Sequence, residues 1–396
     1  MSALPELDLG PAAAAFRGEV RGFLAERWNP RQQALQRRRP QAERGFDRDF
    51  TRLLAEKGWL GVSWPKRWGG QQRSAFEQLA FVEEIEYHRA PVRAHAMAVS
   101  IVGPTLMAHG SEEQQQRFLP AILRGEHCVC LGYSEPDAGS DLASLRSRAQ
   151  SADGGWVIDG AKLYTTMAEL ADHCWLAART DGDAEKHAGI SVFLVPMSTP
   201  GITIRPLEAM SGGRTNAVFF DGVRVGADAL VGAPGGGWAI ITEALTFERV
   251  MLGGRVARVR RELDDLIRHL ATAGDAEGAQ LRSDPRVRDL VGSLVAEVEA
   301  SRLLAVRCVA ELEGGRVPHH QAAMAKIVAA ELEERLAEVA LDLGGPAVTL
   351  AEGAPGAELD GLFEQVVRAS VLDVIGGGTN DIQRTLVAVR GLHLPR

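Results

Sequence analysis

The spacing of apolar residues changes twice along the chain, and this change limits the folds that the chain can adopt. Residues 11–125 carry apolar side chains at helical spacing, as in "FRGEVRGFLAERW". Residues 126–231 consist instead of β-rich runs such as "ISVFLVPM", separated by Asp-Gly dipeptides typical of tight turns. Helical spacing returns after "GAPGGGW" at 232–238, whose composition is that of a linker. The sequence therefore predicts a helical domain, an antiparallel β domain and a second helical domain.

The predicted domain boundaries lie near residues 125 and 233, which gives domains at 1–125, 126–233 and 234–396. In the last domain, apolar residues recur every three or four positions: Met324, Val328, Leu332, Leu336, Val339 and Leu343. Such stripes on long helices are typical of a helical bundle. A Rossmann domain is not predicted, because the strands of the middle region do not alternate with helices and no glycine motif follows a strand as required.

Composition excludes several classes of protein. The net charge of −8 over 396 residues argues against nucleic acid as the main partner. The four cysteines are too few for a disulfide framework. Cys128 and Cys130 have C-x-C spacing, but no second pair of ligands with suitable spacing follows, so a metal site is not predicted. The chain shows no signal sequence and no apolar run of membrane-spanning length, which predicts a cytoplasmic protein without a membrane span.

The segment "LGYSEPDAGSDLASL" at 131–145 has the strongest local chemical character. Ser134, Gly139, Ser140 and Asp141 crowd one loop that leaves a strand. Hydroxyls and free backbone N–H groups in such a loop suit a pyrophosphate or an oxygen-rich ring. An ordinary polar turn would have a similar composition, and residue types alone leave both interpretations open.

Two further segments suggest contact with a ligand. "GAKLYTT" at 160–166 is typical of a strand with Tyr164 and Thr166 on one face, which suits a flat heterocycle, although a half-buried strand is the simpler alternative. "VIGGGTNDIQRTLVAVRG" at 374–391 places three glycines before a helical pattern. Glycines at the start of a helix allow the backbone to approach a ligand closely.

These three segments, in this order, resemble the acyl-CoA dehydrogenase family. The family patterns are roughly T/S-E-P-x-A-G-S-D, G-x-K-x-W-I-T and E-G-T-x-E-I-Q, and the chain has "SEPDAGSD", "GAKLYTT" and "GGTNDIQ". "GWLGVSWPKRWGG" and "AHGSEEQQQRFLPAILRGE" also look like the N-terminal helical domain of the family. The resemblance covers nearly the whole chain. It implies an α+β fold: an N-terminal helical domain, a central antiparallel β-barrel domain and a C-terminal four-helix bundle.

The resemblance also implies a cofactor, FAD, and the residues that contact it. Carried over motif by motif, these are Tyr133, Ser134, Gly139, Ser140, Tyr164, Thr166, Thr379 and Asp381. Tyr164 stands where the family usually has Trp packing on the isoalloxazine, and Thr166 where a hydroxyl meets flavin N5. Ser140 would also lie near the CoA tail, and the loop containing Gly378 would approach the substrate thioester.

The implied reaction converts an acyl-CoA to its trans-2-enoyl-CoA and passes the electrons to an electron-transfer flavoprotein. It requires a carboxylate that removes the α proton and hydrogen bonds to the thioester oxygen. Many family members place this carboxylate at the position of Gly377, so the usual base is missing here. The resemblance implies that the backbone N–H of Gly377, with a ribityl hydroxyl, polarises the thioester carbonyl.

Glu248, in "EALTFERVMLGG", is the candidate for the base. Its neighbours at helical spacing are all apolar: Ala244, Leu245, Met251 and Leu252. An apolar face raises the pKa of a carboxyl group, as a general base requires. An ion pair with Arg249 is the alternative, although adjacent helical residues point about 100° apart. In this respect the chain resembles family members that act on branched or long acyl chains, which place the catalytic glutamate on this helix. The resemblance implies that Arg249 positions the acyl-CoA.

Two departures from the family concern the subunit interface. The usual R-x-x-F-G segment, which reaches the FAD of a neighbouring subunit, is replaced by "GAQLRSDPRVRDLVGSL". Leu341 replaces the usual Gln before "LGG". The family usually forms homodimers or homotetramers, and these changes leave room for a partner subunit of different sequence. Two alternatives to a catalytic acyl-CoA dehydrogenase stay open. One is a non-catalytic subunit of a heteromeric complex, and the other is a related flavoenzyme that acts on a carrier-bound or non-thioester substrate.

Overall fold

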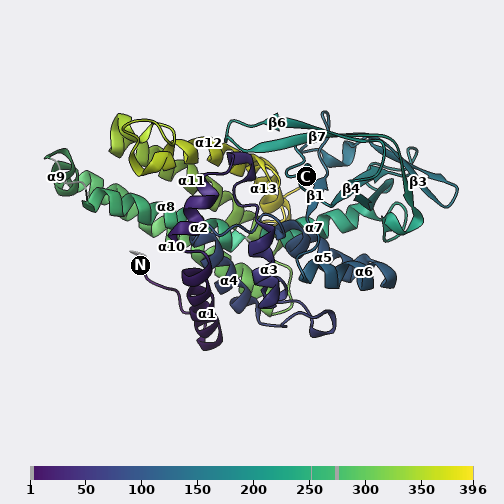
Figure 1. Cartoon of the computed structure of the whole chain (residues 1–396), viewed down its shortest axis with the longest axis horizontal. Helices are drawn as coiled ribbons and strands as arrows, with labels where there is room; N and C mark the ends of the chain where they lie inside the picture. Colours follow the sequence, from purple (N-terminus) through teal and green to yellow (C-terminus); the bar gives the residue numbers. More distant parts are fainter. Residues whose placement is uncertain (1–3, 251, 273–275, 396) are drawn as a thin grey trace.

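The protein has the three-part architecture predicted from its sequence. The computed structural model describes residues 4–250, 252–272 and 276–395, and the side chains of 246–252 and 273–279 lie outside that description. Figure 1 shows the β strands at one end of the molecule, the long helices of the C-terminal part at the other, and the N-terminal helices along one side. The predicted fold class, a β domain between two helical domains, is confirmed.

The N-terminal part is helical up to the first strand. Its helices are α1 (Pro11–Arg27), α2 (Pro30–Arg37), α3 (Arg48–Glu56), α4 (Ala75–Tyr87), α5 (Gly103–His109) and α6 (Glu112–Leu123). Helix α6 begins at a capping box formed by Ser111 and Gln114, a pair whose residue types and spacing are a sequence signal for a helix start. The Ser111 hydroxyl accepts the N–H of Gln114 at 3.2 Å, and the Gln114 side chain accepts the N–H of Ser111 at 3.0 Å. This reciprocal pair satisfies two N–H groups that the helix cannot satisfy internally.

The middle part is one twisted sheet. Its strands are β1 (Val129–Gly132), β2 (Arg148–Ala152), β3 (Gly155–Lys162), β4 (His173–Arg179), β5 (Ile190–Pro196), β6 (Ile202–Glu208), β7 (Arg214–Gly226) and β8 (Leu230–Val231). They lie in the order β6-β7-β3-β2-β4-β5-β8, and β1 pairs with β4. Most pairs are antiparallel, as predicted, but β4 pairs with β1 and β2 in parallel. The strand predicted over 160–166 is shorter than expected, because β3 ends at Lys162.

The C-terminal part contains the longest helices of the molecule. They are α7 (Gly237–Val250), α8 (Leu252–Thr272), α9 (Ala276–Ser283), α10 (Pro285–Glu313), α11 (His319–Val348), α12 (Leu362–Ile375) and α13 (Asn380–Leu386). The predicted stripe on α11 is buried at Leu332 and Leu336, which pack in the bundle core. On α10, Leu290 is 37% exposed, whereas Leu294 and Val298 are fully buried. The bundle core also includes residues near the helix ends, such as Val287 of α10 and Phe363 of α12.

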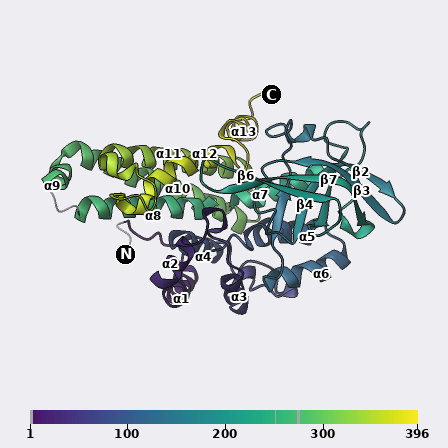
Figure 2. The ribbon, with the colours of Figure 1, turned by 45° about the horizontal axis from the view of Figure 1, so that its top comes forward.

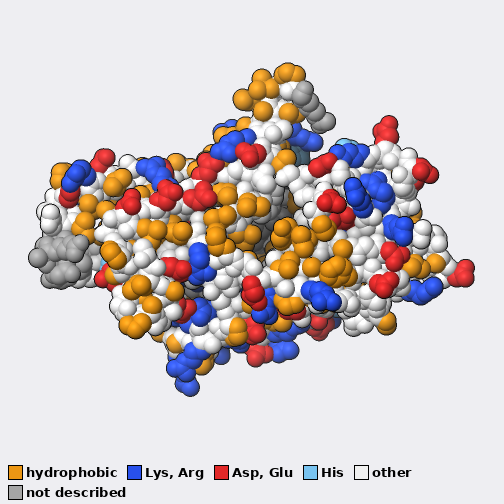
Figure 3. Space-filling model, turned by 90° about the horizontal axis from the view of Figure 1, so that it is seen from above, with side chains coloured by type: hydrophobic (Ala, Val, Ile, Leu, Met, Phe, Trp, Pro, Cys, Tyr) orange, Lys and Arg blue, Asp and Glu red, His pale blue; other side chains and the backbone are white. Residues whose placement is uncertain are grey.

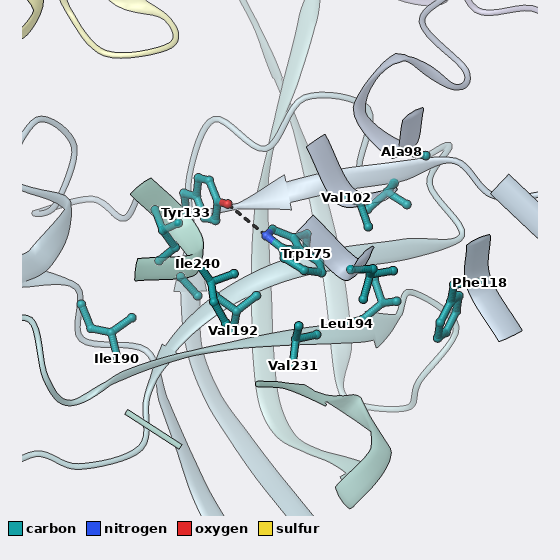
Figure 4. Close-up of a cluster of buried hydrophobic side chains, with 14 of the residues drawn as sticks. Ala98, Val102, Phe118, Tyr133, Trp175, Ile190, Val192, Leu194, Val231 and Ile240 are labelled. Carbon is teal, nitrogen blue, oxygen red and sulfur yellow. Dashed lines mark hydrogen bonds between the residues drawn. The ribbon is translucent and has the colours of Figure 1, made fainter. Parts of the chain in front are cut away.

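One hydrophobic core connects all three parts and places α7 against the sheet. Figure 4 shows Val102 of the N-terminal part near Trp175 of the sheet, and Ile240 of α7 near Val192 at the other side of the same cluster. These side chains are almost fully buried. Because burying such a side chain contributes about 1.5–3 kcal/mol, this cluster fixes the direction of α7 relative to β4 and β5. Since Glu248 lies on α7, the same packing positions its backbone.

Candidate active site

A buried lysine joins the first two sequence motifs. Lys162, the last residue of β3, donates a hydrogen bond from Nζ to Oε1 of Glu135 at 2.7 Å and to the backbone oxygen of Tyr133 at 3.1 Å. The next residue, Leu163, donates its N–H to the backbone oxygen of Ser134 at 2.8 Å. The loop carrying "SEPDAGSD" and the segment "GAKLYTT" are therefore held side by side, as a shared ligand site requires.

The charges of this lysine and glutamate stabilise each other in a dry environment. The Lys162 side chain is 0% exposed and the Glu135 side chain is 7% exposed. Burial alone raises the pKa of Glu135, but Lys162 and the N–H groups of Ser147 and Arg146 outweigh it, so the net pKa lies below its usual value. Burial lowers the pKa of Lys162, and Glu135 opposes that shift. Both groups are best described as charged partners.

The segment after Lys162 turns sharply and presents Tyr164 and Thr166 to solvent. Tyr164 has φ of +60°, in the left-handed region that bulky residues rarely adopt, and it is 66% exposed. Buried Asn216 holds this turn: its backbone oxygen accepts the N–H of Thr165 at 2.9 Å, and its side-chain Nδ2 donates to the Thr165 oxygen at 3.0 Å. A strained, exposed aromatic that is fixed from behind is consistent with a surface for a flat ring.

The predicted residues of the first motif differ in their access to a ligand. The Tyr133 side chain is buried, and its hydroxyl accepts a hydrogen bond from Trp175 Nε1 at 3.0 Å (Figure 4). It would therefore contact a ligand mainly through its backbone. Ser134 is half-buried, whereas Gly139 and Ser140 are exposed. A Cβ added at Gly139 would meet no atom within 4 Å, so this glycine borders open space.

The glycine loop between α12 and α13 has a conformation that requires glycine. Gly377 and Gly378 have φ of +66° and +85°. The fully buried side chain of Gln383 donates from Nε2 to the backbone oxygen of Gly377 at 3.1 Å. Because the peptide group is planar and trans, the N–H of Gly378 points away from Gln383. Thr379 begins α13, and its hydroxyl accepts the N–H of Ile382 at 3.2 Å.

Two predicted residues, Glu248 and Arg249, belong to helix α7. Only their backbone, and not their side chains, is part of what the structure describes. Helix α7 and helix α13 both pack against α11. Figures 1 and 2 both place α13 where the bundle meets the β domain. The helix carrying Glu248 and the helix that follows the glycine loop therefore share one neighbour. Asp381 on α13 is exposed and lies 3.5 Å from Arg384.

The surface between the bundle and the β domain suits an apolar ligand with hydrogen-bonding edges. Figure 3 shows a hollow between these two parts, with hydrophobic side chains gathered on both sides of it. Thr165 Oγ1 and Gln383 Oε1, from two of the motifs, are among the several buried polar side-chain atoms of the described residues that have no hydrogen-bond partner. Buried polar atoms are normally paired, so these two atoms fit a ligand that brings its own polar groups. The described residues contain no cluster of His, Cys, Asp and Glu that could hold a metal ion.

Comparison with known proteins identifies the family. Three family models match consecutive parts of the chain: the acyl-CoA dehydrogenase N-terminal domain at residues 11–126, the middle domain at 130–223 and the C-terminal domain at 235–392. The chain belongs to the acyl-CoA dehydrogenase family. The family predicted from the motifs is therefore confirmed, and with it a flavoenzyme class whose cofactor is FAD. The described part of this acyl-CoA dehydrogenase has no helix with the length and apolar character needed to cross a bilayer.

Relatives of this acyl-CoA dehydrogenase match along its whole length. It is 35% identical to acyl-CoA dehydrogenase FadE26 of Mycobacterium tuberculosis over 98% of each chain. It is 37% identical to acyl-CoA dehydrogenase IpdE1 of the same species, over 96% of this chain and 97% of the relative. Among solved structures, the Tcur3481-Tcur3483 steroid ACAD is similar, with a TM-score of 0.89 and 34% identity over 98% of this chain and all of the other. The ChsE4-ChsE5 complex from M. tuberculosis is also similar, with the same TM-score and identity over 99% of this chain.

The residues present fit FAD. Tyr164 and Thr166 of the second motif are exposed to solvent. Thr165, which lies between them, and Gln383 of the third motif each have a buried side-chain oxygen without a hydrogen-bond partner. Sequence reasoning did not assign a role to Lys162, Asn216 or Gln383. Lys162 and Gln383 are the fixed K and Q of the motifs, which could have drawn attention to them. Asn216 stands in no motif, and only its contact with the turn reveals it.

Proposed function

We propose that this acyl-CoA dehydrogenase converts an acyl-CoA thioester to the trans-2-enoyl-CoA, with Glu248 as the base. FAD, when bound, supplies the acceptor for the β hydrogen and its electron pair. The carboxylate of Glu248 takes the α proton. Arg249 positions the acyl-CoA, and the backbone N–H of Gly377 polarises the thioester carbonyl. The electrons then pass to an electron-transfer flavoprotein.

The conformation of the glycine loop is the observation that carries this proposal. Gly377 occupies the place where many relatives have the catalytic carboxylate, and its φ of +66° costs a non-glycine residue about 1–2 kcal/mol. The loop therefore favours backbone approach to the thioester over a side-chain base. The acidic residue Glu248 stands on helix α7 instead. Helix α7 packs against α11, as does α13, the helix that follows the loop. Both features support the assignment of proton removal to Glu248.

A visible spectrum with an acyl-CoA panel tests this function. We expect the purified protein to be yellow, and one or more thioesters to bleach the flavin absorbance under anaerobic conditions. The panel contains straight-chain and branched thioesters, and also steroid-bearing thioesters because one similar structure is a steroid ACAD. A yellow protein that is bleached by no thioester in the panel, but by a carrier-bound or non-thioester compound, would contradict the proposed reaction.

A second candidate function is membership of a heteromeric enzyme. One similar structure is the ChsE4-ChsE5 complex, and the R-x-x-F-G segment of the family is not found in this chain. The outer face of α12 exposes Val371, Leu372 and Ile375, which favours burial against another subunit. We propose a homodimer or homotetramer as the first choice and a heteromer as the second. The molar mass of the protein in solution, with its FAD content per chain, distinguishes them.

A further inference from the structure

A partly buried ion pair connects α8, which begins just beyond the helix of Glu248, to the start of the glycine loop. Arg255 lies in the first turn of α8, seven residues after Glu248 in the sequence. Its Nη2 donates to Oδ1 of Asp373 at 2.9 Å, and the two side chains are 21% and 14% exposed. Asp373 is on the last turn of α12, three residues before Gly376. The ion pair thus joins two segments that are 118 residues apart in the sequence.

The surroundings of Asp373 keep this pair charged. Burial alone raises the pKa of Asp373, but Arg255, a hydrogen bond from Glu333 and the nearby Arg258 lower it below its usual value. Burial, with the charges of Glu262 and Asp373, raises the pKa of Glu333 on α11, which lies beside Asp373. Asp373 is therefore a carboxylate with partners on both α8 and α11.

A second cation, which is buried, holds the other end of the loop. Lys326 on α11 donates from Nζ to Oδ1 of Asn380 at 2.6 Å and to the backbone oxygen of Val374 at 3.2 Å. Lys326 is 2% exposed and Asn380 is 6% exposed. Val374 precedes the glycines and Asn380 follows them. The flexible glycine segment is thus short and fixed at both ends from inside the bundle.

We propose that Arg255 and Lys326 are positioning residues, which hold the two ends of the glycine loop at the distance from α7 that proton removal requires. The inference rests on the proposed function, because that function places the thioester against this loop and the base on α7. Glycines supply no side-chain packing, so the loop depends on its ends for its position. A displacement of about 1 Å in such a site can reduce a rate by about 100-fold.

The test compares Arg255→Gln and Lys326→Met with the unchanged enzyme, using an acyl-CoA that bleaches the flavin. We expect the limiting rate of flavin reduction at saturating substrate to fall by about 10–100-fold in each variant, while FAD content stays the same. Arg255→Lys keeps the charge and should recover part of the rate. Arg335→Gln is the matched control, because it breaks an ion pair with Glu297 between α10 and α11, away from the loop.

Hydrogen exchange of the FAD-loaded protein without substrate gives a readout that does not depend on activity. Peptides covering 374–383 should exchange faster in Arg255→Gln and Lys326→Met than in Arg335→Gln. A purely structural role would lower thermal stability without faster exchange confined to this segment, and that result would overturn the proposal. So would an unchanged limiting rate in Arg255→Gln. If Arg255→Gln does not fold, Lys326→Met carries the same test at the other end of the loop.

The same experiments separate this inference from the proposed function. If Glu248→Gln keeps the full rate, the assignment of the base fails, whatever Arg255 does. If Glu248→Gln loses activity while Arg255→Gln and Lys326→Met keep both the rate and the exchange pattern, only the positioning role fails.

Discussion

Replacing Lys162 with Met should destabilise the folded protein by about 3–5 kcal/mol at neutral pH. The replacement keeps much of the side-chain volume but leaves the Glu135 carboxylate buried without its cation. Lys162 is 0% exposed and 2.7 Å from that carboxylate, so water cannot replace it. Removing one member of a buried ion pair typically costs about 3–5 kcal/mol, because the remaining charge is uncompensated.

The loss should depend on pH in a defined direction. In the unchanged protein the pKa of Glu135 is below 4.5, so the stability that the charged carboxylate contributes is present above pH 4.5 and is lost as pH falls through its folded value. In the variant, Glu135 takes up a proton more readily. The difference in stability between the two proteins should therefore shrink as pH falls from 7 toward 4.5.

Urea unfolding followed by circular dichroism at pH 7 and pH 5 measures this prediction. Lys186→Met is the control, because Lys186 pairs with Asp141 on the surface and exposed ion pairs contribute little. A loss below about 1 kcal/mol for Lys162→Met at pH 7, or a loss equal to that of the control, would refute the argument that Lys162 neutralises a buried charge.

Two further predictions concern the cofactor and acid stability. Thr166→Ala should change the visible flavin spectrum or weaken FAD binding without unfolding the protein, whereas Thr199→Ala, elsewhere in the β domain, should do neither; identical spectra would contradict the assigned contact. Burial lowers the pKa of His95 from 6.5 to about 4, so the stability from its neutral form is full above pH 6.5 and declines as pH falls toward 4. One pKa unit is worth about 1.36 kcal/mol, so the neutral His95 makes the free energy of unfolding fall by about 3 kcal/mol between pH 6.5 and 4. His95→Gln should abolish this fall, as measured by urea unfolding at several pH values. The same dependence on pH in the variant would contradict the prediction.

Much of the architecture was predictable because it follows from local features. The Asp-Gly turns and β-rich runs indicated the middle sheet, and the stripe containing Leu332 and Leu336 indicated a bundle helix whose central turns are buried. The capping box at Ser111 is a four-residue signal, and it gave the start of α6. The end of β3 was less predictable. Tyr164 has a strand-forming side chain, but two hydrogen bonds between Asn216 and the next residue, Thr165, hold this segment in a left-handed turn.

The site was predictable as a set of motifs, but its internal contacts were not. Glu135 and Lys162 both stand in motifs, yet their ion pair depends on the crossing of two segments that are 27 residues apart. Arg255 and Asp373 stand in no motif and meet across 118 residues. No local spacing predicts such contacts, because they depend on how the helices of the bundle pack. The roles of Glu248 and Gly377 stay predictions.

The most direct test of the account is the rate of flavin reduction in Glu248→Gln under single-turnover conditions. The replacement keeps the shape of the side chain and removes the basic oxygen. General base catalysis contributes about 100- to 10,000-fold, so the limiting rate should fall by at least about 100-fold while FAD stays bound. A limiting rate within about threefold of the unchanged enzyme, with full FAD content, would contradict the assignment of Glu248 as the base.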